Sequence, residues 1–415
     1  MGAYARRDDG TIGRDVIRFS RPSRRDAVRA MAAAAGASLL DPGPVLAGII
    51  GQTAQSCGDP DALGQLVASL PLSRPGGLVQ PFGVKIGGPG LDARANTDLS
   101  GLQADRLTTL TEQVYVRTEC PSAVAARREP WTIKTSGLLA RAGAVPLDDL
   151  SRTARAMGAH LLECSGNNNP ANFGLMSVAE WDGVPLADVV STLRPSPEAT
   201  AVVVSGVDPD QPSRTSIPGA SWVFPLASLD SLGAFLTVRM NGESLPLDHG
   251  RPVRLAVPGW YGCSWIKWVD EIRLVDASEP ATSQMREFAT RTHQTAVHEL
   301  ARDYAPPAIQ TAAMPVRVEK RLGAAGLEYR VVGIVWGGAR AVDRLAIRFS
   351  DGDPWKAFDI CPVPGSPAIW SLWTYRWKPA APGQYTIALR VPDATVPQRR
   401  LESGYYVRQV TIDEV

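Results

Sequence analysis

Apolar and polar positions along the middle of the chain follow both helical and strand periods. Residues 147–160 space their apolar side chains like a short amphipathic helix, which leads into a buried strand at residues 160–163. Residues 184–190 fit a second short helix, and the apolar run at residues 201–206 fits a buried strand. Residues 281–303 are polar and helix-prone. The pattern therefore predicts a domain of mixed short helices and strands.

The pattern changes after the two prolines at positions 306 and 307. From there on, β-branched and aromatic segments recur at the spacing of a β-sandwich, with turn signals between them. The predicted strands are residues 316–319, 329–336, 344–349, 385–390 and 405–412. Residues 42–105 are rich in Gly and Pro and predict an extended lead-in. We expect an α+β protein with a mixed domain over about residues 49–305 and an all-β domain over 310–415.

Composition narrows the classes of partner. The 43 basic and 42 acidic residues give a net charge of +1, which offers no reason to expect nucleic acid or an anionic membrane as a partner. The 38 glycines and 34 prolines favour a loop-rich fold with many short strands over a helical bundle.

The N-terminal segment has the pattern of an export signal. Arg24 and Arg25 precede a weakly apolar run at residues 27–40, which predicts a twin-arginine signal over residues 1–48 and a periplasmic location. An Ala-rich helix behind a basic tail is the alternative. The run is too short to span a bilayer, which needs about 20 residues.

Cysteine and histidine are few and scattered. The five cysteines form no CxxC pair, which argues against a disulfide scaffold or a structural zinc site. The four histidines form no HExxH. A redox metal would therefore have to arrive inside a cofactor.

Cys164 stands out by its position. It ends an apolar strand where the chain turns into Ser165-Gly166-Asn167, and strand ends that feed polar loops are where sites are usually built. A free cysteine is more often a small buried hydrophobe, which is the alternative here. As a thiolate it would be a soft metal ligand.

A second candidate site is cationic. Tight Gly/Pro turns bring His249, Arg254 and Lys267 near each other, and such a cluster suits a phosphate. Three ordinary surface cations are the alternative.

These segments resemble the sulfite-oxidase superfamily of molybdenum-cofactor (molybdopterin) oxidoreductases, in its bacterial branch without a haem domain. The resemblance rests on Cys-Ser-Gly-Asn at residues 164–167, Ala-Glu-Trp-Asp-Gly-Val at 179–184, Asp-His-Gly-Arg-Pro-Val-Arg at 248–254 and Trp-Ile-Lys-Trp at 265–268. It implies that the Cys164 thiolate binds molybdenum.

The same resemblance implies which residues bind the rest of the cofactor. Arg117, in residues 115–121, matches an arginine beside the metal and its cofactor. Asp208 matches a residue that contacts the pterin, although a turn-forming aspartate is as good a reading. The remaining residues implied to wrap the pterin and its phosphate are His249, Arg254, Trp265, Ile266 and Lys267.

The resemblance continues into the C-terminal domain. Trp370 and Trp373 match its immunoglobulin-like dimerisation domain, where we expect them in the core or an interface, and this implies a homodimer. The implied reaction is two-electron oxo transfer on a small-molecule substrate. The chain has no haem-attachment, flavin or dinucleotide motif, so the electrons would pass to a separate protein such as a cytochrome.

Departures from the family pattern bear on the substrate. Asn168 and Asn169 stand where true sulfite oxidases have arginines, and Phe288 stands where they have a tyrosine. We therefore expect a poor sulfite oxidase. Arg291 or His293, on the helix-prone segment, is expected to reach towards the substrate cavity; a solvated helix face is the alternative.

Two other functions remain open at this stage. One is reduction of a sulfoxide or another organic oxide on the same cofactor. The other is a non-catalytic secreted binding protein built on the β domain. A hydrolase is disfavoured because the chain has no GxSxG motif.

Overall fold

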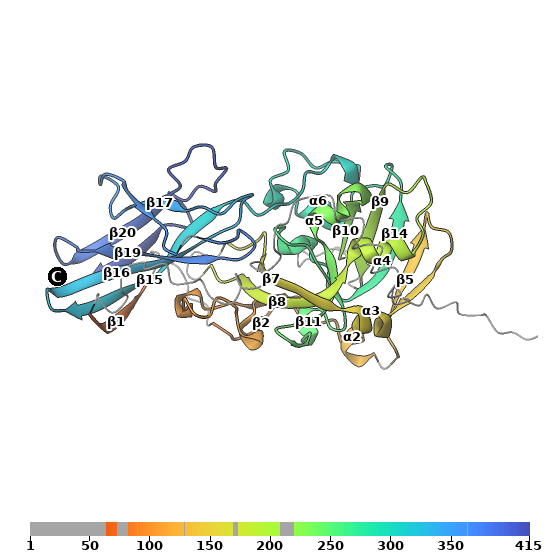
Figure 1. The fold of residues 1–415 in the computed structure, drawn as a ribbon, viewed down its shortest axis with the longest axis horizontal. Helices are drawn as coiled ribbons and strands as arrows, with labels where there is room; N and C mark the ends of the chain where they lie inside the picture. The colour runs from red at the N-terminus through yellow and green to blue at the C-terminus, as the bar shows by residue number, and fades with distance from the viewer. Residues whose placement is uncertain are drawn as a thin grey trace, which may run out of the picture.

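The computed structural model describes residues 64–72, 82–88, 90–127, 129–168, 173–207, 220–362 and 364–415. The predicted export signal at residues 1–48, together with Asn169 and Asp208, lies outside these ranges. The described part is elongated, with the C-terminal strands at one end and the mixed domain at the other (Figure 1).

Short elements dominate the mixed domain. Its strands are β2 (Ile86–Gly87), β3 (Asp92–Ala95), β4 (Val116–Thr118), β5 (Thr132–Gly137), β6 (Gly143–Pro146), β7 (Arg155–Glu163), β8 (Met176–Pro185), β9 (Ala201–Gly206), β10 (Ser221–Pro225), β11 (Phe235–Met240), β12 (Glu243–Ser244), β13 (Arg254–Ala256) and β14 (Val269–Val275). Its α-helices are α2 (Ser122–Ala126), α3 (Leu147–Thr153), α4 (Leu186–Thr192), α5 (Leu229–Leu232) and α6 (Ser283–Glu287).

Two five-stranded sheets frame this domain. One has the strand order β10-β9-β14-β5-β6, and the other has β12-β11-β8-β7 with β13 paired to β11. β14 and β5 run parallel, whereas the other neighbours pair antiparallel. β2, β3 and β4 form a small third sheet.

Among the described residues from 312 to 415, all the regular secondary-structure elements are strands. They are β15 (Ala312–Gly323), β16 (Gly326–Trp336), β17 (Arg344–Arg348), β18 (Lys356–Asp359), β19 (Ser371–Trp377), β20 (Gly383–Arg390) and β21 (Arg408–Ile412). They form two four-stranded sheets, β1-β15-β16-β19 and β18-β17-β20-β21. The sequence pattern predicts five of these strands and misses β18 and β19.

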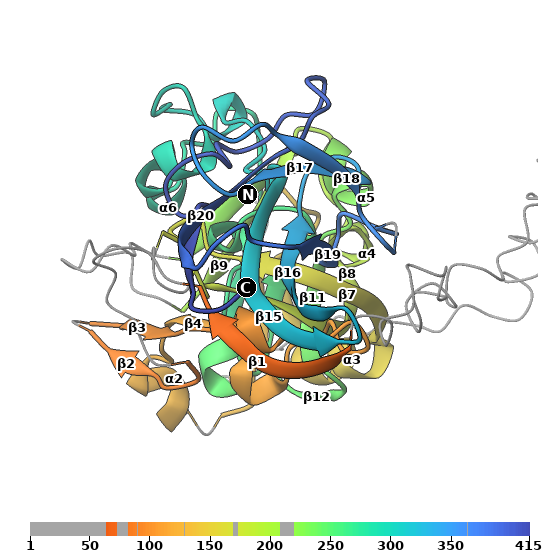
Figure 2. The ribbon, with the colours of Figure 1, turned by 90° about the vertical axis from the view of Figure 1, so that its left-hand side faces the viewer.

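The lead-in contributes a strand that the sequence pattern does not predict. β1 (Gln65–Pro71) pairs antiparallel with β15, and Figure 2 shows the two side by side. Residues 65–71 therefore belong to the C-terminal sheet and not to the mixed domain. Their apolar side chains give little signal because they bury little surface: Leu66 and Val67 remain 48% and 54% exposed.

Two predicted helices are shorter in the structure. α3 ends at Thr153, and the rest of the segment predicted as helix is strand, because β7 pairs with β8 from Arg155 to Glu163. Such pairing outweighs the helix propensity of a few residues. The predicted strand at residues 201–206 is confirmed as β9, and the helix predicted at 184–190 appears as α4, shifted by two residues.

The helix-prone segment at residues 281–303 is mostly not helical. It contains α6 and two 3₁₀ turns at residues 290–292 and 301–303. His293, with φ of 63°, ends the first of these turns in the left-handed region. The Ala281 amide then donates to the Glu299 carbonyl at 2.7 Å, so the segment folds back on itself.

Large aromatic side chains fill the interior of both domains. Trp370 and Trp373 are 0% exposed, so within the chain both are core residues. The Trp370 indole donates to the Leu107 carbonyl at 2.9 Å and links the two domains.

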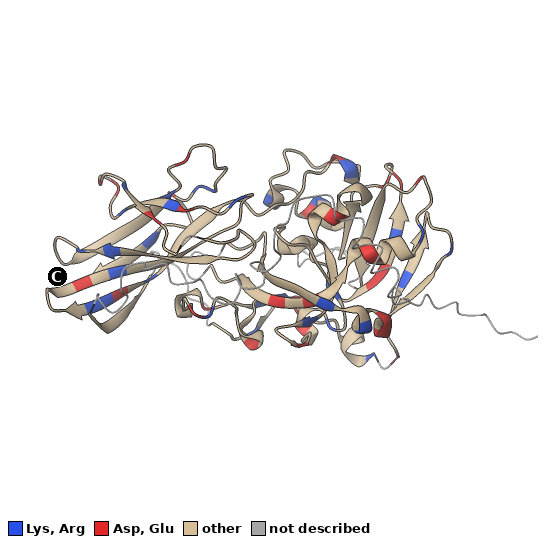
Figure 3. Cartoon of the chain, viewed as in Figure 1, with Lys and Arg blue, Asp and Glu red and all other residues tan. Residues whose placement is uncertain are grey.

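Charges of both signs are scattered over the molecule (Figure 3). Within the described ranges, no helix is long and apolar enough to cross a membrane.

Candidate active site

Cys164 lies on the wall of a cavity in the mixed domain. It follows β7 directly, and its amide donates to the Leu175 carbonyl at 3.0 Å. The Gly166 amide lies 3.3 Å from Sγ, and the Asn167 amide donates to the Cys164 carbonyl at 2.9 Å. These bonds close a tight turn that points the thiol into the cavity. Burial raises the pKa of the thiol, and nearby Arg117 partly offsets that rise.

Asn167 stabilises the cysteine turn from behind. Its side-chain amide donates to the Phe173 carbonyl at 3.1 Å, and its side-chain oxygen accepts from the Leu175 amide at 3.2 Å. The asparagine of the Cys-Ser-Gly-Asn segment therefore stabilises the loop, and it does not line the cavity.

Arg117 lies on β4 and lines the same cavity. It is ion-paired with Asp92, and burial together with neighbouring Arg291 lowers its pKa, while Cys164 acts in the opposite direction. Arg117 is thus bound to a carboxylate and lies close enough to Cys164 to influence the thiol.

Arg291 approaches the cysteine turn from the segment after α6. A Cβ built on Gly166 would lie 3.7 Å from the Arg291 Nη1 atom and 3.6 Å from Cys164 Sγ, so the guanidinium and the thiol flank the same glycine. The Arg291 side chain is 41% exposed, and among the described residues its one acidic neighbour within 4.0 Å is Glu287 at 3.9 Å. Of the two residues on this segment that are expected near the cavity, Arg291 is the one beside the thiol.

His293 contacts Tyr261. Its Nε2 atom is 3.4 Å from the Tyr261 hydroxyl, and the residue is exposed. Partial burial of the ring and the nearby Arg399 lower its pKa. Neither Arg291 nor His293 lines the cavity itself.

The three predicted phosphate-binding cations meet in this cavity. His249, Arg254 and Lys267 all line it. Arg254 is 3% exposed and donates to two backbone carbonyls, those of His249 at 3.2 Å and Trp265 at 3.3 Å. Its Nε atom has no partner, and among the described residues no carboxylate lies within salt-bridge distance of it. A buried cation without a counter-charge is costly, which marks the place as suited to an anion.

Burial shifts the protonation of this cluster. It lowers the pKa of Arg254 to about 10, so the guanidinium stays charged at neutral pH. It also lowers the pKa of His249 to about 3, with Arg254 and Lys267 acting in the same direction, so His249 is neutral. Lys267 donates to the carbonyls of Thr118 at 2.5 Å and Asp248 at 2.9 Å.

A glycine allows the cations to come this close. Gly250 has φ of 105°, and a Cβ there would lie 2.9 Å from the Arg254 Cβ and 3.2 Å from the Lys267 Cβ. The Leu255 amide donates to the Ile266 carbonyl at 2.7 Å and holds the two halves of the segment together. Trp265 and Ile266, 2% and 1% exposed, line the cavity beside them.

Comparisons with known proteins agree with this geometry. A family model described as the oxidoreductase molybdopterin binding domain matches residues 119–283, which include Cys164 and the cationic cluster. Sulfite oxidase from Gallus gallus is 30% identical over 302 residues, covering 66% of this chain and 63% of the relative. Residues 119–283 therefore belong to the molybdopterin-binding domain family that is found in the sulfite-oxidase superfamily of molybdenum-cofactor oxidoreductases.

Other similar proteins are named for other substrates. The NADPH nitrate reductase of Aspergillus niger is 28% identical over 63% of this chain and 33% of its own. The chain spans about a third to two thirds of the length of these curated relatives. The crystal structure of the sulfane dehydrogenase SoxCD from Paracoccus pantotrophus shares the fold, with a TM-score of 0.60 at 17% identity over 90% of this chain and all of that one. A non-catalytic binding protein is inconsistent with this oxidoreductase family.

The cofactor of the family is molybdenum held by molybdopterin, and the cavity fits it. A thiol at one wall can become a soft metal ligand, as such a metal requires. At the other wall, the buried Arg254 with its unpartnered Nε suits the phosphate of the pterin. Trp265 and Ile266 line the same cavity.

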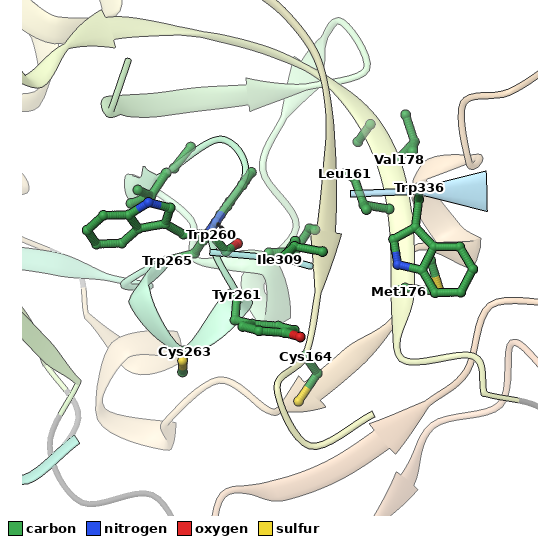
Figure 4. Close-up of a cluster of buried hydrophobic side chains, with 14 of the residues drawn as sticks. Leu161, Cys164, Met176, Val178, Trp260, Tyr261, Cys263, Trp265, Ile309 and Trp336 are labelled. Atoms are coloured by element: carbon green, nitrogen blue, oxygen red, sulfur yellow. Dashed lines mark hydrogen bonds between the residues drawn. The ribbon is translucent and has the colours of Figure 1, made fainter. Parts of the chain in front are cut away.

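Some residues around the cavity carry no signal in the sequence. Tyr115 and Cys263 line it, and Figure 4 shows the Tyr261 ring beside the cysteine turn. Phe288 lines the cavity without a hydroxyl, but Tyr115 places a phenol in the same wall. Asn168, where a sulfite oxidase has arginine, is exposed at the edge of the described loop.

Proposed function

We propose that the protein catalyses two-electron oxo transfer on a small substrate and passes the electrons to a separate carrier protein, such as a cytochrome. One observation carries this proposal: Cys164 and the carboxylate-free Arg254 share a single buried cavity. When bound, the cofactor supplies molybdenum that alternates between its hexavalent and tetravalent states.

The chain's own residues bind and orient this cofactor. Cys164 is proposed as the protein ligand of the metal. Arg254 and Lys267 hold the phosphate by charge, and neutral His249 holds it by a hydrogen bond. Trp265 and Ile266 shield the pterin from water. Asp208 is proposed as a further pterin contact and lies outside the described residues.

The substrate is proposed to meet two guanidinium groups. Arg117 and Arg291 both lie near the Cys164 thiol, which favours a substrate that presents a polar or negative oxygen. Because Arg117 is already paired with Asp92 and Arg291 is partly exposed, we infer weaker oxyanion binding than two dedicated arginines would give.

Reduction of a sulfoxide or another organic oxide is the second candidate. The observation that favours it is the apolar wall formed by Phe288 and Ala220, which suits an organic group better than a bare oxyanion.

The C-terminal domain is proposed to form an immunoglobulin-like sandwich and a homodimer interface, which its two four-stranded sheets support. Export to the periplasm is supported by Cys361, which is disulfide-bonded, because disulfides persist in oxidising compartments. Cys164 and Cys263 are free thiols.

Steady-state kinetics with an artificial electron acceptor test the substrate proposal. Sulfite should be oxidised slowly and with a high KM, because Asn168 brings no charge and each missing charged hydrogen bond weakens binding by about 1.5–3 kcal/mol. Arg291→Ala should raise KM further, whereas Arg302→Ala, an exposed arginine paired with the neighbouring Asp303, should not. Fast turnover that saturates at micromolar sulfite would overturn this proposal.

A further inference from the structure

A buried carboxylate lies directly behind the proposed metal ligand. Glu163 ends β7 and precedes Cys164, and its side chain is 1% exposed. Arg399 donates to both carboxylate oxygens at 2.7 Å, from Nη1 to Oε1 and from Nη2 to Oε2. The Trp336 indole donates to Oε2 at 2.9 Å. Both donor residues come from the C-terminal domain, Trp336 from the end of β16 and Arg399 from the loop between β20 and β21.

The Arg399 guanidinium also lies over the ring of Tyr261. Its Cζ atom lies 5.4 Å from the centre of that ring, and Tyr261 immediately precedes Gly262 and Cys263, which line the cavity. Its Nη1 atom donates to the Tyr406 hydroxyl at 3.1 Å, and the Arg399 amide donates to the Thr311 carbonyl at 3.0 Å. Figure 4 shows Tyr261 near Cys164, with Trp336 on the C-terminal strand nearby.

This ion pair joins two buried charges, since the side chains of Arg399 and Glu163 are 8% and 1% exposed. Burial works against the charge of Arg399, but Glu163 outweighs it and raises the pKa of Arg399 well above its usual value. Two parallel bonds from a planar guanidinium fix the plane of the carboxylate as well as its position. Consecutive Cα atoms are about 3.8 Å apart, so a fixed Glu163 constrains where the next residue can point its thiol.

Fold stability alone does not account for the pair. The cost of removing two charges from water roughly cancels their attraction, and apolar residues of the same size often stabilise a fold as well. The pair does fix the backbone next to Cys164, and with it the orientation of the thiol, which a metal ligand needs.

We propose that Arg399 and Trp336 are positioning residues of the metal site. By holding the Glu163 carboxylate, they set the direction of the Cys164 thiolate, so the C-terminal domain completes a site whose cavity is otherwise built by the mixed domain. This inference rests on the proposed function, in which Cys164 binds molybdenum.

The test compares two buried glutamates in the full-length, cofactor-loaded protein. Glu163→Gln removes the charge behind Cys164. Glu319→Gln is the matched control, because Glu319 is 5% exposed and is bound by Arg317 at 3.0 Å and Arg330 at 2.6 Å within the C-terminal sheet. The readouts are molybdenum per folded chain and the electron paramagnetic resonance spectrum of the pentavalent metal, which responds to the direction of a thiolate ligand.

Glu163→Gln should weaken metal binding about 10–100-fold, as expected for an outer partner of a ligand, and should change the spectrum. Arg399→Lys should act in the same direction, since an ammonium cannot make the two parallel bonds. Glu319→Gln should keep the wild-type metal content and spectrum. Trp336→Phe removes one N–H while keeping a ring in the core, and should change the spectrum with little loss of metal.

Trp336→Phe decides the question if Glu163→Gln does not accumulate as folded protein. The inference is overturned if wild-type protein carries molybdenum and the variants near Cys164 match Glu319→Gln in metal content and spectrum. Wild-type protein without molybdenum would instead contradict the proposed function, and the inference with it.

Discussion

Two buried arginines show how the cavity differs from the rest of the core. Arg399 is paired with Glu163, whereas Arg254, also buried, meets only backbone carbonyls and the faces of Trp181 and Trp265 among the described residues. In the folded chain, the charge of Arg399 is therefore neutralised by Glu163, whereas Arg254 can still bind an anion. The sequence predicts Arg254 because its neighbours match a family motif. Arg399 is not predictable in this way, because its partner lies 236 residues away.

Arg254→Met should separate folding from cofactor binding. In cofactor-free protein, the free energy of unfolding should stay the same or rise by about 1–4 kcal/mol, because a buried charge is replaced by an apolar side chain. Cofactor content should fall sharply. Arg239→Met is the control: Arg239 is 43% exposed and should shift stability by less than about 0.5 kcal/mol and leave cofactor content unchanged. Chemical denaturation and pterin analysis measure both effects, and full pterin content in Arg254→Met would contradict the role of Arg254.

His249 should make the cofactor-free protein sensitive to mild acid. Burial lowers its pKa to about 3, so its contribution to stability is complete above the unfolded pKa of about 6.5 and is lost as pH falls towards 3. Between pH 7 and pH 5 this amounts to about 2 kcal/mol. Urea unfolding of His249→Gln should show a smaller loss over that interval than wild type. Equal losses would show that His249 is not buried in its neutral form.

At the scale of elements, short strand ends deliver the site residues. β7 ends at Glu163, immediately before Cys164; β4 carries Arg117, and β9 ends at Gly206 against the Lys267 backbone. Fully apolar strands such as β9 are predictable from sequence because both faces are buried. β1 is not, because it lies at a sheet edge and exposes most of its side chains. The segment after α6 was expected to be helical and instead turns at His293, which brings Arg291 beside Gly166.

Gly206→Ala should disturb both the packing of β9 and the binding of the cofactor. A Cβ at this position would lie 2.2 Å from the Lys267 carbonyl oxygen, so β9 or the lysine backbone must move. We expect a loss of about 1–3 kcal/mol in unfolding free energy, together with weaker cofactor retention. Gly87→Ala, where a Cβ would meet nothing within 4 Å, should do neither. Thermal unfolding and molybdenum content check this, and unchanged cofactor retention in Gly206→Ala would show that the Lys267 position is not critical.

At the scale of the whole molecule, residues of both domains contribute to the surroundings of Cys164. The sequence predicts a division near residue 305. Across this division, β1 pairs with β15, and Arg399 and Trp336 bind the Glu163 carboxylate. Contacts between distant segments leave no periodic trace in a single sequence, whereas the local motifs around Cys164 and Arg254 do. The cofactor site is therefore largely predictable, and its coupling to the second domain is not.

Molybdenum content per chain in wild-type protein, Cys164→Ser and Cys263→Ser tests the central claim most directly. Both cysteines line the cavity, so the two variants are matched in burial and chemistry. A hydroxyl is a poor substitute for a thiolate on this metal, so Cys164→Ser should be folded and nearly free of molybdenum. Cys263→Ser should carry as much as wild type. Equal molybdenum in Cys164→Ser and wild type, or none in wild type, would contradict the account.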